Sequence, residues 1–69
     1  MKVVEITGGL KTTLPSMEYR LLKRIIDKNM TIIDSKKLTE KQIILCDSLV
    51  EYHVLDKEED YYYLREVYL

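Results

Sequence analysis

Cys46 and His53 are the only cysteine and the only histidine in the sequence, so they are the first residues to consider for nucleophilic catalysis or metal binding. They lie on one predicted helix, and a rise of 1.5 Å per residue separates their backbones by about 10.5 Å. This separation is too large for a direct Cys–His hydrogen bond or a shared ion. No further cysteine or histidine completes a set of four zinc ligands. We expect a small buried thiol and a histidine at a helix end, with no catalytic residue, no metal and no cofactor.

The stretch TGGLKTT, residues 7–13, places two glycines close to a Lys-Thr pair, as a phosphate-binding loop does. A P-loop needs the spacing G-x-x-x-x-G-K-[ST], because consecutive backbone N–H groups must surround the phosphates while the lysine reaches them. Here Leu10 separates Gly9 from Lys11, and the first glycine of that spacing is absent. A chain of 69 residues also lacks room for the parallel sheet that supports such a loop. We interpret the two glycines as a turn.

Positive and negative charges are unevenly divided along the chain, although the net charge is only −1. Between residues 11 and 41, eight basic residues against four acidic ones leave +4, whereas between residues 42 and 69 two basic residues against seven acidic ones leave −5. A polyanion would therefore meet the first half of the chain, where basic side chains could displace counterions from phosphates. A solvated helix face has the same composition. The basic residues form two clusters, one of Arg20, Lys23, Arg24 and Lys28 and one of Lys36, Lys37 and Lys41.

Local signals predict the elements that must position these side chains. Residues 2–7 (KVVEIT) are rich in β-branched residues and predict a strand, and residues 10–14 are expected to be a connector. A helix is predicted over residues 16–28, with Ser16 as its cap and an apolar stripe at helical spacing. Asn29 is expected to end it in a left-handed conformation.

Residues 30–37 (MTIIDSKK) allow two predictions. Thr31 could cap a single helical turn with Asp34 at its third position, or Thr31 could begin a short strand that is followed by a turn. The next helix has the strongest start signal in the chain, because Thr39 and Gln42 match the T-x-x-Q capping box. We predict this helix over residues 40–53.

The remaining residues predict a β-hairpin. Val54 and Leu55 enter its first strand, residues 56–60 (DKEED) form an acidic turn, and residues 61–67 return. The order is therefore strand, helix, short element, capped helix and hairpin, which predicts an α+β fold in a single domain over residues 1–69.

Residues 16–65 resemble a winged-helix (winged helix-turn-helix) domain of the small single-domain type. Such domains commonly show a helix that ends in Leu-Val-Glu, then a two-stranded wing that closes on Tyr-x-Leu. Here Leu49-Val50-Glu51, Val54-Leu55 and Tyr62-Tyr63-Leu64 occupy those places. The resemblance implies two main helices plus a C-terminal β-hairpin wing, with an added N-terminal strand that could pair with the wing sheet. The element before Thr39 is shorter than the family's usual second helix.

The resemblance also implies that the helix over residues 40–53 enters the major groove of DNA. Lys41, Gln42 and Ser48 on its outward side can donate hydrogen bonds to base edges. Asp47 and Glu51 share that side and would repel phosphates, and this helix has no arginine. The predicted nucleic-acid-binding residues are Arg20, Lys23, Arg24, Lys36, Lys37, Lys41, Gln42 and Ser48.

The hairpin tyrosines predict a different kind of contact. Side chains alternate along a strand, so a wing that closes on Tyr62 and Leu64 turns Tyr61, Tyr63 and Arg65 outwards. Tyrosine and arginine are enriched in protein interfaces, although they can also stack on unpaired bases. The acidic turn favours a protein partner or solvent over DNA. The predicted protein-interface residues are Tyr52, Tyr61, Tyr63, Arg65 and Tyr68.

Length and composition exclude several function classes. A chain of 69 residues has little room for a small-molecule site, and no acid–base pair or nucleophile constellation is present, so we do not expect an enzyme. The sequence contains no run of about 18 apolar residues, so it predicts no membrane span. A single cysteine without a secretory leader suits a cytoplasmic protein. The apolar end, residues 67–69, is expected to dock on its own domain or in a partner.

We therefore expect a small DNA-associated regulatory or accessory protein that binds double-stranded DNA. The alternative is a protein–protein interaction module, an adaptor or an inhibitor of a host protein, that uses the wing tyrosines and the acidic second half. Winged-helix domains as a family serve as protein adaptors as well as DNA readers, and in composition the chain is similar to small phage or mobile-element accessory proteins. A homodimer is compatible with both expectations.

Overall fold

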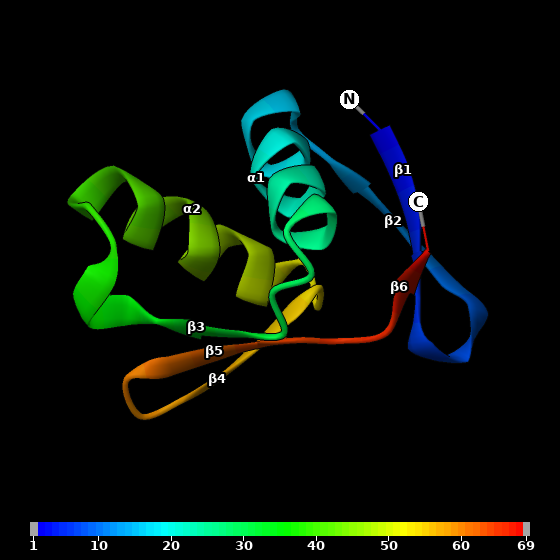
Figure 1. Cartoon of the computed structure of the whole chain (residues 1–69). Coiled ribbons are helices and arrows are strands. Elements are labelled where there is room, and N and C mark those ends of the chain that lie inside the picture. The colour runs from blue at the N-terminus through cyan, green and yellow to red at the C-terminus, as the bar shows by residue number, and fades with distance from the viewer. Residues whose placement is uncertain (1, 69) are drawn as a thin grey trace.

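The chain folds into two helices and two small antiparallel sheets, an α+β arrangement (Figure 1). The computed structural model describes residues 2–68. In chain order the elements are β1 (Lys2–Ile6), η1 (Thr7–Gly9), β2 (Leu10–Leu14), α1 (Ser16–Asp27), β3 (Ile32–Asp34), η2 (Ser35–Lys37), α2 (Glu40–Glu51), β4 (Leu55–Glu58), β5 (Tyr61–Leu64) and β6 (Val67–Tyr68).

The first sheet has the strand order β2-β1-β6. The expectation of a connector over residues 10–14 was wrong, because this segment is β2 and pairs with β1 along its whole length, from Ile6↔Leu10 to Lys2↔Leu14. Gly8 and Gly9, both at positive φ, reverse the chain between the two strands. The other edge of β1 pairs with β6 through Ile6↔Val67 and Glu5↔Tyr68. The N-terminal strand β1 therefore lies in a different sheet from the β4–β5 hairpin, and the expectation that it could pair with the wing sheet was wrong.

The second sheet has the order β3-β5-β4. Of the two predictions for residues 30–37, the strand followed by a turn is confirmed: β3 leads into η2, where the Asp34 carboxylate accepts from the backbone N–H of Lys36 at 3.0 Å. The acidic turn is shorter than expected, because β4 continues to Glu58. Only two residues, Glu59 and Asp60, connect it to β5, with Glu59 at a φ of 52°. The return strand ends at Leu64, three residues before its predicted end.

The two helices begin in different ways. At α1 the cap position is occupied by Pro15 without any side-chain cap, so Ser16 lies inside the helix and the expectation that it caps was wrong. Asn29 adopts the expected left-handed conformation, with a φ of 55°. At α2 the predicted capping box is confirmed. The helix ends at Glu51 and not at residue 53, because His53 turns to a φ of 63° and directs the chain into the second sheet.

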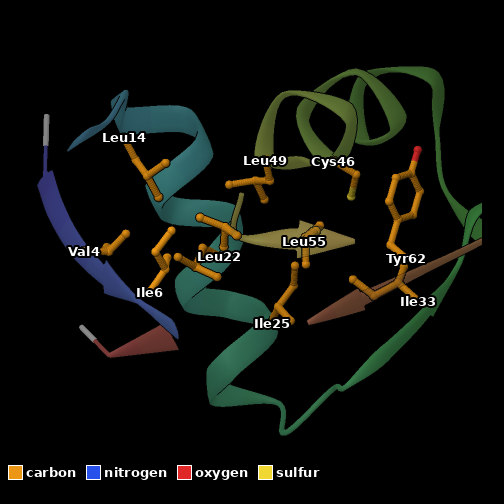
Figure 2. Packing of buried hydrophobic residues seen from close by; sticks show 11 residues of the cluster. Val4, Ile6, Leu14, Leu22, Ile25, Ile33, Cys46, Leu49, Leu55 and Tyr62 are labelled. Carbon is orange, nitrogen blue, oxygen red and sulfur yellow. The ribbon is translucent and has the colours of Figure 1, made fainter. Parts of the chain in front are cut away.

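One hydrophobic cluster joins both sheets and both helices (Figure 2). The helices cover one face of the second sheet, and the first sheet flanks α1 (Figure 1). Tyr62 is fully buried at the end of the cluster beside α2, as its predicted inward orientation requires. The other buried members are Val4, Ile6, Leu14, Leu22, Ile25, Ile33, Cys46, Leu49, Val54 and Leu55.

Candidate nucleic-acid interface

The exposed side of α1 carries most of the first basic cluster. Leu22 and Ile25 are buried on the opposite side of this helix, so the amphipathic sequence turns its charged residues to solvent. An open hollow of about 700 Å³ runs along this exposed side, and we call it the α1 hollow. Among its lining residues are Lys2, Arg20, Lys23, Arg24, Asp27 and Lys28.

A second hollow of about 360 Å³ lies between α1 and the start of α2, and we call it the interhelical hollow. Arg20 and Arg24 line both hollows and therefore stand between them. Lys41 and Gln42, at the N-terminal end of α2, line the second one together with the apolar side chains of α1. The fold thus brings together Arg20, Lys23, Arg24, Lys41 and Gln42 from the predicted nucleic-acid-binding set.

The capping box orients Gln42 at this site. Its side-chain Oε1 accepts from the backbone N–H of Thr39 at 3.0 Å, and its own backbone N–H donates to Thr39 Oγ1 at 3.2 Å. The box uses only the carboxamide oxygen, so the amide nitrogen is left to donate to a base edge or a phosphate. Lys41 beside it is exposed at the positive end of the helix, which favours anions.

Lys36 and Lys37 lie in η2 and line neither hollow. Lys36 Nζ is 3.6 Å from Asp60 Oδ2 at the tip of the hairpin. Both partners are largely exposed, so this ion pair is weak. Its effect on binding is to place a carboxylate beside the cation, which lowers the positive potential that Lys36 offers to a phosphate.

Ser48 and Asp47 make contacts within the protein that the sequence did not indicate. The Ser48 hydroxyl donates to Glu18 Oε2 at 3.1 Å and so joins α2 to α1. Asp47 Oδ1 accepts from the Tyr62 hydroxyl at 2.6 Å, and Lys57 Nζ lies 3.5 Å from the same oxygen. The charge of Asp47, expected to repel phosphates, is therefore partly balanced by the hairpin.

Burial and the carboxylate of Asp47 also raise the pKa values of two neighbouring side chains, Tyr62 and Cys46. Burial, and then the hydrogen bond to Asp47, raise the pKa of Tyr62 well above its usual range. Burial, and then the negative charge of Asp47, raise the pKa of the Cys46 thiol to about 11. Cys46 is thus a protonated core thiol, and a thiol is a poor nucleophile.

The hairpin tyrosines divide between the two faces of the second sheet. The register sets Ile32, Tyr63 and Asp56 in one row, and Asp34, Tyr61 and Glu58 in the next, on the face turned away from the helices. We call these two rows the outer face of the second sheet. Tyr61 is 42% exposed and Ile32 is 55% exposed. Arg65 is tied to this face by Asp56, whose Oδ2 lies 3.8 Å from Arg65 Nε.

Tyr52 and Tyr68 lie away from the outer face. Tyr52 is the C-terminal cap of α2 and packs half-buried against the core. Tyr68 lies in β6 of the first sheet, is exposed, and donates its hydroxyl to Glu66. The predicted protein-interface residues are therefore spread over more than one surface. Leu69, the last residue of the predicted apolar end, lies outside the described residues.

Sequence reasoning missed the exposed apolar residues near these surfaces, among them Ile44 and Ile32. Ile44 is 68% exposed on α2, between the exposed residues Lys41 and Asp47. An apolar side chain there can contact a thymine methyl group or a protein. Ile32 completes a row of the outer face. Strand alternation next to the buried Ile33 could have predicted that Ile32 is exposed. Helical spacing could have predicted the same for Ile44.

Within residues 2–68 no group of three or more Cys, His, Asp or Glu side chains is arranged to hold a metal ion. Neither described helix has the length and apolar character needed to cross a membrane. Comparison of the chain with protein-family models, with curated proteins and with solved structures finds no match. The class that the fold defines is thus a small α+β domain, and its function must be argued from its surfaces.

Proposed function

We propose that the chain is a small DNA-associated regulatory or accessory protein that binds double-stranded DNA. The contacts come from the exposed side of α1 and from the N-terminal end of α2. The observation that carries the proposal is the position of Arg20 and Arg24, which line both hollows next to Lys41 and Gln42. Phosphate contacts by arginine and lysine supply affinity, whereas Gln42 offers an amide donor for base edges.

The distribution of ion pairs supports this assignment. Across the described residues, the salt bridges join Lys36 to Asp60, Lys57 to Asp47 and Arg65 to Asp56. The cations of α1 take part in none of these salt bridges. They can therefore neutralise phosphates without first breaking a salt bridge within the protein.

The order of elements supports a winged-helix-like architecture. The segment from α1 to β5 runs helix, strand, short turn, helix and hairpin, and β3 completes a three-stranded sheet with the hairpin. In this comparison η2 takes the place of the family's second helix and α2 that of the helix that enters the major groove. Helix-turn-helix proteins read bases with the N-terminal residues of that helix, which is where Lys41 and Gln42 lie.

Binding to a random DNA duplex as a function of salt concentration tests the proposal. We expect affinity to fall steeply as salt rises, with a slope of about 0.9 per phosphate contact in a logarithmic plot. Arg20→Ala and Arg24→Ala should each weaken binding and reduce that slope by about one contact. Lys11→Ala is the matched control, because it removes one exposed cation from the first sheet, away from both hollows.

A flat salt dependence, or an equal loss for the Lys11 and Arg24 variants, would contradict DNA binding through this surface. Lys36→Glu combined with Lys37→Glu should also weaken binding. We expect a smaller loss per charge than at Arg24, because Asp60 already lies beside Lys36.

A second candidate function is protein binding through the outer face of the second sheet. The specific observation is that Ile32, Tyr61 and Tyr63 lie together on the face that the two helices leave uncovered (Figure 1). Large rigid aromatic side chains next to an exposed aliphatic one are typical of interface cores. Acidic residues surround them, so a partner with a basic surface fits best.

A further inference from the structure

Two oppositely charged surfaces lie on different elements of the molecule, one on α1 and one on the second sheet. Leu22 and Ile25 of α1 and Ile33 and Tyr62 of the second sheet point into the same core (Figure 2). The basic side of α1 and the outer face of the second sheet therefore both point away from that core.

The free charges on these two surfaces are complementary. On the basic side, Arg20 and Arg24 take part in no described salt bridge. On the acidic side, Asp56 and Asp60 are paired within the protein, whereas Glu58 and Glu59 belong to none of the described salt bridges. Each surface thus has charges that remain available to another molecule.

The hairpin end of the outer face is hollowed in a way that suits a guanidinium group. Glu58, Glu59, Tyr61 and Tyr63 line an open space of about 450 Å³. Carboxylates bind arginine through charge-assisted hydrogen bonds, and the faces of tyrosine rings attract the planar guanidinium. Arginine side chains of a partner are therefore the expected occupants of this space.

We propose that the outer face of the second sheet binds the basic side of α1 in a second copy of this chain, with Arg20 and Arg24 entering the hollow beside Tyr61 and Tyr63. Such a contact is head-to-tail, because each molecule uses two different surfaces. The inference rests on the second candidate function and names its partner.

The charge distribution favours a second copy over an unrelated basic protein. The chain carries +4 between residues 11 and 41 and −5 between residues 42 and 69, yet its net charge is only −1. A net charge near zero leaves little overall repulsion between identical molecules, while the separated charges attract one another in the head-to-tail orientation.

The proposed contact uses the same arginines as DNA binding. A DNA phosphate backbone and the outer face of a neighbouring molecule would therefore compete for Arg20 and Arg24. Self-association is measured without DNA, so its result stands whether or not the chain binds DNA. A wild-type protein that binds DNA but does not self-associate would overturn this inference alone.

Sedimentation velocity at low and high salt tests the contact, with two charge-reversal variants. The wild-type protein should form assemblies larger than one chain at about 0.02 M salt and dissociate by about 0.5 M salt, where charges are screened within a few ångströms. Arg24→Glu reverses a charge on the basic side of α1, and Glu58→Arg reverses a charge on the outer face of the second sheet. Each variant alone has only one intact surface, so it should remain a single chain.

A mixture of the two variants provides the decisive measurement. Arg24→Glu retains an intact acidic surface and Glu58→Arg retains an intact basic one, so together they should form a complex that neither variant forms alone. Glu51→Arg and Lys11→Glu, which reverse exposed charges outside both surfaces, should assemble as the wild type does. Tyr61→Ala combined with Tyr63→Ala should weaken assembly, with circular dichroism confirming that the fold is retained.

Three results would overturn the proposal. They are a wild-type protein that remains a single chain at low salt, self-association that does not change with salt, and a variant mixture in which no complex forms.

Discussion

At the scale of single residues, Tyr62 is the side chain that links the hairpin to α2. Its ring is fully buried, its hydroxyl donates to Asp47 at 2.6 Å, and Lys57 Nζ lies 5.3 Å from the centre of the ring. The resemblance to a wing that closes on Tyr-x-Leu implied the inward orientation of Tyr62. It could not predict Asp47 as the partner, because that contact joins residues 15 positions apart on different elements.

Removing the hydroxyl alone should measure this link. We expect Tyr62→Phe to lower the free energy of unfolding by about 1.5 kcal/mol, since a hydrogen bond to a charged group is lost while the buried ring stays in place. Urea denaturation at neutral pH checks the value. Tyr61→Phe is the control, because that side chain is exposed on the outer face and should leave stability unchanged. Equal stability of the two variants would contradict the structural role of the Tyr62 hydroxyl.

At the scale of elements, α1 and α2 show how far local sequence signals reach. The capping box of α2 is complete within four residues, so Thr39 and Gln42 could be recognised without any tertiary information. At α1, Pro15 and Ser16 both suit a helix start, and the prediction that Ser16 caps was wrong because Pro15 takes the cap position. The strand β2 was missed because its pairing with β1 depends on a reversal at two glycines and not on a pattern within residues 10–14.

The contrast between the two helix starts is directly testable. Thr39→Ala should cost about 1 kcal/mol of stability, because it leaves a backbone N–H at the start of α2 without its partner. Ser16→Ala makes the same kind of change in α1 and should be close to neutral, because Ser16 makes no cap hydrogen bond. Urea denaturation of the two variants decides the matter, and a larger loss for Ser16→Ala would contradict the observed caps.

The sequence predicted which residues could belong to a candidate surface, but it did not predict which of them lie together in the fold. The basic residues of α1 could be grouped from the sequence, and the structure places them on the side of the helix opposite the buried Leu22. The separation of Lys36 from Arg24 depends on how η2 packs against the hairpin tip, where the backbone N–H of Ser35 donates to the carbonyl oxygen of Asp60 at 2.9 Å. Such a contact between distant segments has no local signal.

At the scale of the whole molecule, a single core must hold both sheets and both helices. Cys46 is a member of this core, and it is a group whose ionisation opposes folding at moderately alkaline pH. Its pKa rises from 9.0 to about 11 in the folded protein, first because of burial and then because of the charge of Asp47. The unfolded chain therefore releases the thiol proton at a lower pH than the folded chain does.

The free energy of unfolding should accordingly fall as pH rises from about 9 towards about 11, since the unfolded state binds fewer protons in that range. Cys46→Ala should flatten the decline between about pH 9 and about pH 10, the range below the ordinary pKa values of tyrosine and lysine. Urea denaturation at closely spaced pH values compares the two slopes. Identical slopes for wild type and variant would show that Cys46 is not the group responsible.

The pairing of β1 with β6 has a consequence for how the molecule reaches its native state. Residues 5 and 6 meet residues 67 and 68, so the contact joins segments that are separated by nearly the whole chain. The β1–β2 hairpin and the two helices have mostly local contacts and can form early, whereas closing so long a loop costs more entropy than closing a hairpin. The last strand is therefore expected to dock late, after α2 and the β4–β5 hairpin have folded.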